Sequence, residues 1–259
     1  MLDVFQSAIL MVVVIAGSLG CLILVHRLWP AEQRRPQNDL IGWHITVLGT
    51  TYAVILGFML YAVWTNFQNA DSNAEAEANS LINMVRSADG LADAPRQEID
   101  RLAARYIDLM LNEEWPAMER MNFDYTASHQ VVQDLWNVVS RTTTHNNSEE
   151  TSRDHTLTEL SQMTDHRRLR QLQADSDLPV ILWAVLVTGA VVTIVSACLF
   201  GSAHFQLHFI QVATLSLLLA LLLVAIEDIN RPFQGAVHVR AVGFERARAT
   251  LSSYRQSPR

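Results

Sequence analysis

Residues 44–67 read HITVLGTTYAVILGFMLYAVWTNF, and the chain continues from Phe67 to Gly90 as FQNADSNAEAEANSLINMVRSADG. The first stretch is apolar and long enough to cross the roughly 30 Å hydrocarbon core of a bilayer as a helix. No proline or glycine interrupts the polar stretch before Gly90. The sequence here therefore predicts one helix that leaves a membrane and continues into water.

Three further apolar blocks accompany this one. The four blocks cover residues 7–25, 41–65, 178–200 and 205–226. Each is close to the roughly 20 residues that a membrane-spanning helix needs. The first block lacks the A-x-A cleavage pattern of a secretory signal peptide, so we expect it to remain as a span. The pattern predicts an all-α membrane protein with four transmembrane helices.

The long polar segment between the second and third blocks is predicted to be helical throughout. One helix opens at Pro95, carries an apolar stripe at 3–4 spacing and is expected to end at Pro116. Another is expected over about 127–140. The next should cover about 148–174, because Asn147 and Glu150 have the spacing of a capping box. We therefore expect four regions in this order: two spans in 1–66, a helical insert in 67–177, two spans in 178–226, and a turn with a tail helix in 227–259.

The distribution of arginine predicts the orientation. Four spans place both termini and the helical insert on one side of the membrane. That side carries seven arginines near the spans, against three in the loop between the first two spans. Because arginine and lysine accumulate in cytoplasmic loops, we expect the insert and both termini to be cytoplasmic. The seven are Arg86, Arg167, Arg168, Arg170, Arg231, Arg240 and Arg246, and the three are Arg27, Arg34 and Arg35.

The charge of the insert limits its partners. Residues 67–177 hold 20 acidic and 10 basic side chains. Such a domain attracts cations and repels nucleic acid. A solvated helical surface is the simpler explanation of the same composition, since charged helix faces usually serve solubility.

No catalytic or cofactor motif is present in the sequence. The H-E-x-x-H pattern and glycine-rich phosphate loops are both missing. His204 and His208 have i, i+4 spacing, which allows a shared metal ion, but interfacial histidines beside aromatic residues explain them as well. We expect no enzyme activity, no cofactor and no metal site.

The second span differs from the others because it mixes hydroxyl and small residues with apolar ones. Thr50, Val54 and Phe58 follow one another at i, i+4 and i+8, so they fall on one stripe of a helix. Repeated around a symmetry axis, this stripe would form a narrow apolar neck that gates by dewetting. Close packing between helices uses the same residue types and is the alternative.

The fourth span is followed by the segment EDINRPFQG, residues 227–235. Glu227 and Asp228 are expected to mark the membrane surface. Pro232 cannot continue a helix, Phe233 would project from a stiff turn, and Gly235 would close that turn. A turn without any ligand is the simpler interpretation, and the acid-free QGAVHV that follows argues against a calcium site.

These motifs resemble a known family. VILGFMLYAVW (54–64) is similar to the neck segment of bestrophins, which are pentameric ion channels, and IEDINRPFQG (226–235) is similar to the turn after their last span. EWPAM (114–118), LPVILW (178–183) and RPFQG (231–235) look closer still to a bestrophin-like, mostly bacterial family of unknown function. The resemblance covers the chain from about Asn38 to Val239.

The resemblance implies a homo-oligomeric ion channel, a pentamer, in a bacterial inner membrane. Its partners would be further copies of itself, the lipid bilayer and permeating ions, and the acidic insert would give a weak preference for cations. The alternative is a non-conducting membrane scaffold or sensor whose helical domain binds a partner. A scaffold would bury the stripe of the second span against the other spans of the same chain, whereas a channel would leave it around a central axis.

Overall fold

The computed structural model describes residues 4–122 and 124–256, and in this part of the chain every regular element is helical. Four helices are long and apolar enough to cross a membrane, as the four apolar blocks predict. The chain forms two compact units. The first holds the residues up to Thr65 together with Asp177–Asn230, and the second holds Asn66–Ser176 and the residues from Arg231 onward.

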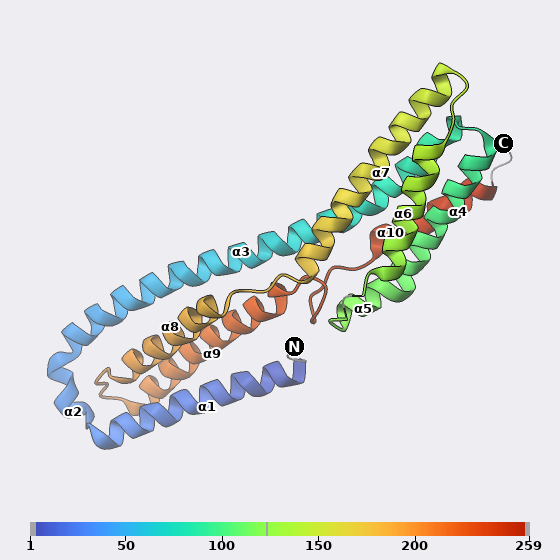
Figure 1. Cartoon of the computed structure of the whole chain (residues 1–259). Coiled ribbons are helices and arrows are strands. Elements are labelled where there is room, and N and C mark those ends of the chain that lie inside the picture. The colour runs from blue at the N-terminus through green and yellow to red at the C-terminus, as the bar shows by residue number, and fades with distance from the viewer. Residues whose placement is uncertain (1–3, 123, 257–259) are drawn as a thin grey trace. The chain divides into compact units, whose positions relative to one another are not determined.

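The first unit is a bundle of apolar helices. Both α8 and α9 pack against α1, and they also pack against each other (Figure 1). Its core is formed mainly by aliphatic side chains, among them Leu22, Leu186 and Leu219. The helices of this unit are α1 (Val4–Leu28), α2 (Ala31–Arg34), the first part of α3 (Asn38–Ser87), α8 (Val180–Cys198) and α9 (Phe205–Asn230).

The two loops between spans are tied together by polar side chains. The buried guanidinium of Arg34 donates to the carbonyl oxygens of Cys198 and Phe200, at 2.7 and 3.3 Å. Asn38 and Gly201 exchange two hydrogen bonds of 3.0 and 2.9 Å. These contacts satisfy carbonyl groups at the end of α8 that have no partner within the helix.

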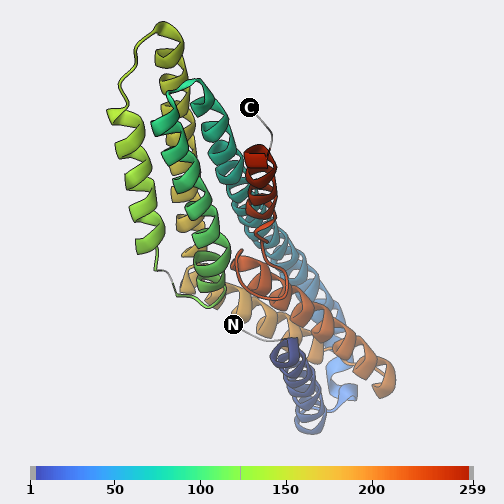
Figure 2. The same cartoon turned by 90° about the vertical axis from the view of Figure 1, so that its right-hand side faces the viewer.

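The second unit is a helical bundle built on the remainder of α3. In Figures 1 and 2, α4, α6 and α7 run side by side, and α10 packs against α4. The core is continuous and apolar, and it includes the predicted stripe of α4 at Ile99, Leu102, Tyr106 and Met110. The helices are α4 (Asp93–Leu109), a π-helix (Met110–Glu114), α5 (Trp115–Glu119), α6 (Thr126–Arg141), α7 (Asn147–Ala174) and α10 (Val242–Gln256).

Two local predictions about this unit are wrong. Pro116 does not end the helix that starts before it, because the chain passes through the π-helix and continues as α5 with Pro116 in its first turn. A proline is tolerated there, since the amides of a first turn have no partner within their own helix. The capping residue of α7 is Asn146, not Asn147: its Oδ1 accepts from the Glu149 amide at 2.9 Å.

Candidate functional site

Thr50, Val54 and Phe58 lie on an exposed face of α3. Val54 is 53% exposed and Phe58 is 69% exposed, and Thr50 is exposed as well. Tyr61, at i+3 from Phe58, continues this face and is 69% exposed. Among the described residues, therefore, no other span covers the stripe.

The opposite face of α3 is fixed against α8 by Tyr52. Its hydroxyl donates to the carbonyl oxygen of Leu186 at 2.6 Å. A Cβ atom at Gly189 would lie 2.4 Å from two ring carbons of Tyr52, so only glycine leaves room for this ring. Leu56 and Val63 are buried on α3 together with Tyr52. This anchor determines which face of α3 remains outward.

Gly57 lies next to Phe58 on α3, and a glycine in a membrane-spanning helix can let a neighbouring helix approach closely. A Cβ atom built on Gly57 would meet no other atom within 4 Å, and the same holds for Gly49. No helix of the described chain uses these glycines for close packing. The space beside them is open.

The acidic pair at the start of the exit segment lies in the last turn of α9. Glu227 and Asp228 do not end α9, which continues to Asn230, and both side chains are half-buried. The side-chain amide of Asn230 donates to the carboxylate of Asp177. The polar end of the helix is thus held by an amide–carboxylate contact within the first unit.

Pro232, Phe233 and Gly235 lie in the turn that follows α9. Pro232 is buried and its carbonyl oxygen accepts from the amide of Val239 at 2.7 Å. Gly235 has φ = 89°, a left-handed conformation that favours glycine. Phe233 is 1% exposed and meets Trp115 edge to face, with ring centroids 5.5 Å apart.

Trp115 makes the main contacts with this turn. Its indole N–H donates to the carbonyl oxygen of Val239 at 3.2 Å, and its ring also contacts Phe244 of α10. Gln234 adds a hydrogen bond of 3.4 Å from its side-chain amide to the carbonyl oxygen of Met118. The turn therefore closes a loop over the π-helix and α5.

A buried ionic cluster lies beside Trp115, and the sequence reasoning missed it. Arg170 of α7 donates to both carboxylate oxygens of Glu77, at 2.6 and 3.2 Å, and to Oε1 of Glu114 at 2.7 Å. Arg170 and Glu77 are 0% exposed and Glu114 is 3% exposed. The hydroxyl of Tyr106 donates to Glu77. The cluster therefore joins side chains from α3, α4, the π-helix and α7.

The protonation states of this cluster follow from its surroundings. Burial raises the pKa of Tyr106 well above its ordinary value, and the neighbouring Glu77 raises it further, so the phenol remains a donor. Burial alone would lower the pKa of Arg170, but Glu77 and Glu114 raise it well above its ordinary value. Arg170 therefore stays charged, with its guanidinium carbon 5.7 Å from the centre of the Trp115 ring.

Neither histidine spacing nor carboxylate spacing produces a metal centre in the part of the chain that the structure describes, where no three metal-ligating side chains gather. His208 points to a backbone group, with Nε2 at 3.0 Å from the carbonyl oxygen of Ala197. Glu114 keeps one carboxylate oxygen, Oε2, that has no hydrogen-bond partner among the described residues.

The fold defines an all-helical, polytopic membrane protein. The chain belongs to the bestrophin-like family, because the model of the bestrophin-like domain matches residues 12–244. No curated protein matches the chain significantly in sequence.

Solved structures of a bacterial bestrophin homologue from Klebsiella pneumoniae share the fold. One has a TM-score of 0.71 at 12% identity, and the match covers 96% of this chain and 100% of the homologue. Two variants of that homologue give TM-scores of 0.71 and 0.68 at 13% and 14% identity, covering 96% and 95% of this chain and 99% of theirs. At this identity the likeness establishes the fold alone.

Proposed function

We propose that the protein is a homo-oligomeric ion channel, a pentamer, in which the α3 helices surround the pore. The observation that carries the proposal is the exposure of Val54 and Phe58, at 53% and 69%, on a span whose opposite face is anchored by Tyr52. Membership of the bestrophin-like family supports it, since bestrophins are channels with a neck at the corresponding segment.

The neck in this proposal is formed by Thr50, Val54 and Phe58. An apolar ring of that kind holds water poorly, so ions meet a barrier while the ring is narrow. The acidic insert raises the local concentration of cations and gives a weak preference for them, which decreases as salt screens the charge. The insert and both termini are assigned to the cytoplasm, and the membrane to a bacterial inner membrane.

A non-conducting scaffold or sensor fits the observations less well. That function requires the stripe to be buried against α1, α8 or α9 of the same chain. Val54 and Phe58 are exposed instead. An exposed stripe that faces lipid is the remaining competitor, and the following experiment separates it from a pore.

The test is the conductance of the purified protein in planar bilayers. Replacing Phe58 with alanine should widen the neck and raise the single-channel conductance, by about fivefold if the barrier falls by about 1 kcal/mol. The matched control is Phe5→Ala, because Phe5 is also a strongly exposed phenylalanine, 72%, but lies on α1. The control should conduct like the unmodified protein.

Two results would reject the channel. One is a Phe58→Ala variant whose conductance equals that of Phe5→Ala and of the unmodified protein. The other is a native mass of a single chain in detergent and in lipid, because one copy of α3 cannot surround a pore.

A further inference from the structure

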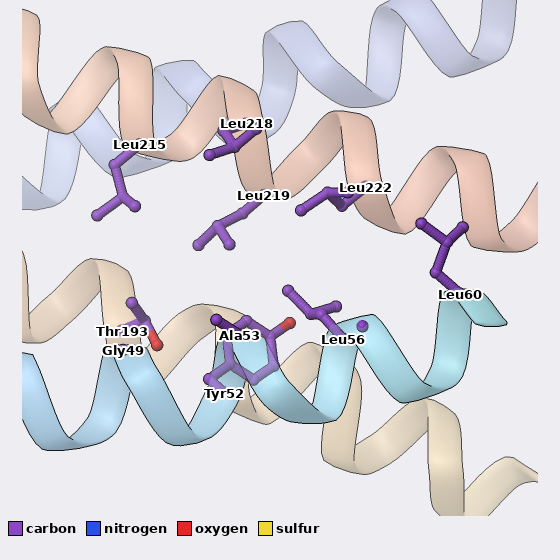
Figure 3. A pocket seen from close by; sticks show the side chains of 11 residues that line it. Gly49, Tyr52, Ala53, Leu56, Leu60, Thr193, Leu215, Leu218, Leu219 and Leu222 are labelled. Atoms are coloured by element: carbon purple, nitrogen blue, oxygen red, sulfur yellow. The ribbon is translucent and has the colours of Figure 1, made fainter.

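A furrow lies between α3 and α9 in the first unit. Its first hollow has a volume of about 290 Å³. It is lined by α3 between Gly49 and Leu60, by α9 between Leu215 and Leu222, and by Thr193 of α8. Figure 3 shows the four leucines of α9 on one side of this space and the side chains of α3 on the other.

A second hollow extends the furrow toward the start of both helices. It also has a volume of about 290 Å³, and it shares Leu215 with the first hollow. On α3 the two hollows together run from Gly42 to Leu60. At about 1.5 Å per residue this is about 27 Å, which is long enough for an acyl chain of one leaflet, because such a chain crosses about half of the roughly 30 Å hydrocarbon core.

The wall of the first hollow has no polar group that requires a ligand. Its two hydroxyl groups are already paired: Tyr52 donates to the carbonyl oxygen of Leu186 at 2.6 Å, and Thr193 donates to that of Gly189 at 2.7 Å. The other side chains that line it are aliphatic. An apolar molecule can therefore fill the space without leaving a polar group unsatisfied.

The second hollow becomes polar at its end. It is lined by His208 and by Gln211, and the side chain of Gln211 is exposed with no partner among the described residues. The furrow is thus apolar over most of its length and offers an amide at one end. A phospholipid has the same division, with a long hydrocarbon chain and an ester group at its polar end.

The volume of each hollow, about 290 Å³, is too small to hold a helix. An α-helix with its side chains is about 10–12 Å across, far too wide for a hollow of this size between two neighbouring helices. A single hydrocarbon chain is narrower and can reach the backbone of α3. The positions of the missing Cβ atoms at Gly49 and Gly57 have no neighbour within 4 Å, so nothing blocks its approach. If the furrow stayed empty, the residues that line it would lose the dispersion contacts that such a chain provides.

We propose that this furrow is a binding site for one acyl chain of a membrane phospholipid, with the ester end of the lipid at Gln211. The site does not depend on the channel function, since it is formed within one copy of the chain. The bound chain lies directly against the backbone of α3 between Gly49 and Gly57.

The experiment is photolabelling of the full-length protein in phospholipid vesicles. A small fraction of the phospholipid carries a diazirine in the middle of one acyl chain, and the adducts are mapped by mass spectrometry. We expect adducts to concentrate on Leu215–Leu222 and to exceed those on the exposed face of α1. Filling the hollow with Gly57→Leu should lower the furrow adducts by at least about fivefold, which corresponds to about 1 kcal/mol of steric exclusion.

The matched control is Gly17→Leu. Gly17 is a helical glycine of α1 whose Cβ position is equally open, and it lies outside the furrow. This variant should leave the furrow adducts unchanged. Ala53→Leu fills the same hollow from a neighbouring position, so it replaces Gly57→Leu if that variant does not fold.

The proposal is overturned if the furrow is labelled no more strongly than α1, or if neither filling variant lowers its labelling. Disulfide formation between two copies of a Gly57→Cys variant, in a background without native cysteines, would also overturn it. That result would mean that a second copy of the chain covers the furrow.

Discussion

Arg170 carries a permanent positive charge at a point that water does not reach. It is held there by two carboxylates, Glu77 and Glu114, at 2.6 and 2.7 Å. Removing a charge from water is costly, and the attraction of its partners compensates only when the geometry is close. The bidentate contact with Glu77 meets this condition, so the cluster depends on all of its members.

Replacing Arg170 with methionine should be strongly destabilising. The volume is nearly kept, but two buried carboxylates lose their common cation, which typically costs about 3–5 kcal/mol. For a chain of this size that corresponds to a fall in Tm of at least about 6 °C. Thermal unfolding in detergent, followed by tryptophan fluorescence, measures it.

The control for this prediction is Arg168→Met. Arg168 lies two residues before Arg170 on α7 and is exposed. Its loss should change the stability by no more than about 0.5 kcal/mol. Equal melting temperatures for the two variants would show that the cluster does not stabilise the fold.

At the scale of elements, the exit turn is held by one aromatic contact and one backbone conformation. Phe233 rests on Trp115, and Gly235 takes a φ of 89° that other residues adopt only with strain. Because the turn joins α9 to α10, its conformation determines how the tail reaches the core of the second unit.

The change Gly235→Ala should loosen this turn. A left-handed alanine costs about 1 kcal/mol or more, which raises the population of the opened turn about fivefold. Trypsin should then cleave at Arg240 about five times faster than in the unmodified protein. The control is Gly17→Ala, in an open position on α1, which should leave the rate of cleavage at Arg240 unchanged. Equal cleavage rates for the two variants would contradict the proposed backbone strain at position 235.

The helices themselves could be predicted from the sequence, because each depends on a local pattern. The apolar length of α1, α8 and α9 and the stripe at Ile99 and Leu102 are visible within one stretch of residues. Local signals locate a boundary only approximately, which explains why the cap of α7 lies at Asn146, one residue before the predicted position.

Contacts between distant residues could not be predicted in the same way. Glu77 lies 93 residues from Arg170 in the sequence, and nothing in their surroundings distinguishes them from exposed charges. Glu114 stands next to Glu113 in the sequence, but its partner Arg170 is 56 residues away on α7. The exposed stripe at Thr50, Val54 and Phe58 was found because it repeats at helical spacing, and its role as a neck stays a prediction.

For the whole molecule, the arginine distribution predicts which side of the membrane each loop faces. Gln33, in the loop between the first two spans, and Asn146, at the start of α7, are both exposed. Single cysteines at these positions, in a background without Cys21 and Cys198, should react differently with an impermeant maleimide on intact cells. Gln33→Cys should be labelled at least about tenfold more strongly than Asn146→Cys, as the positive-inside rule requires.

Lysis of the cells before labelling is the control, and it should make the two positions equally reactive. Strong labelling of Asn146→Cys on intact cells would invert the orientation and place the acidic insert outside. The channel could survive that result, but the cytoplasmic assignment could not.

The long sequence separation within the ionic cluster also sets a timetable for biosynthesis. A ribosome adds roughly 5–20 residues per second. Arg170 follows Glu77 by 93 residues, so it is synthesised about 5 to 20 seconds later. Val239, which accepts the indole hydrogen bond of Trp115, is made a further 69 residues after Arg170. The helical insert therefore cannot reach its final packing until the fourth span has been synthesised, and a nascent chain that stalls before this point exposes an unpaired carboxylate to the quality-control proteases of the cell.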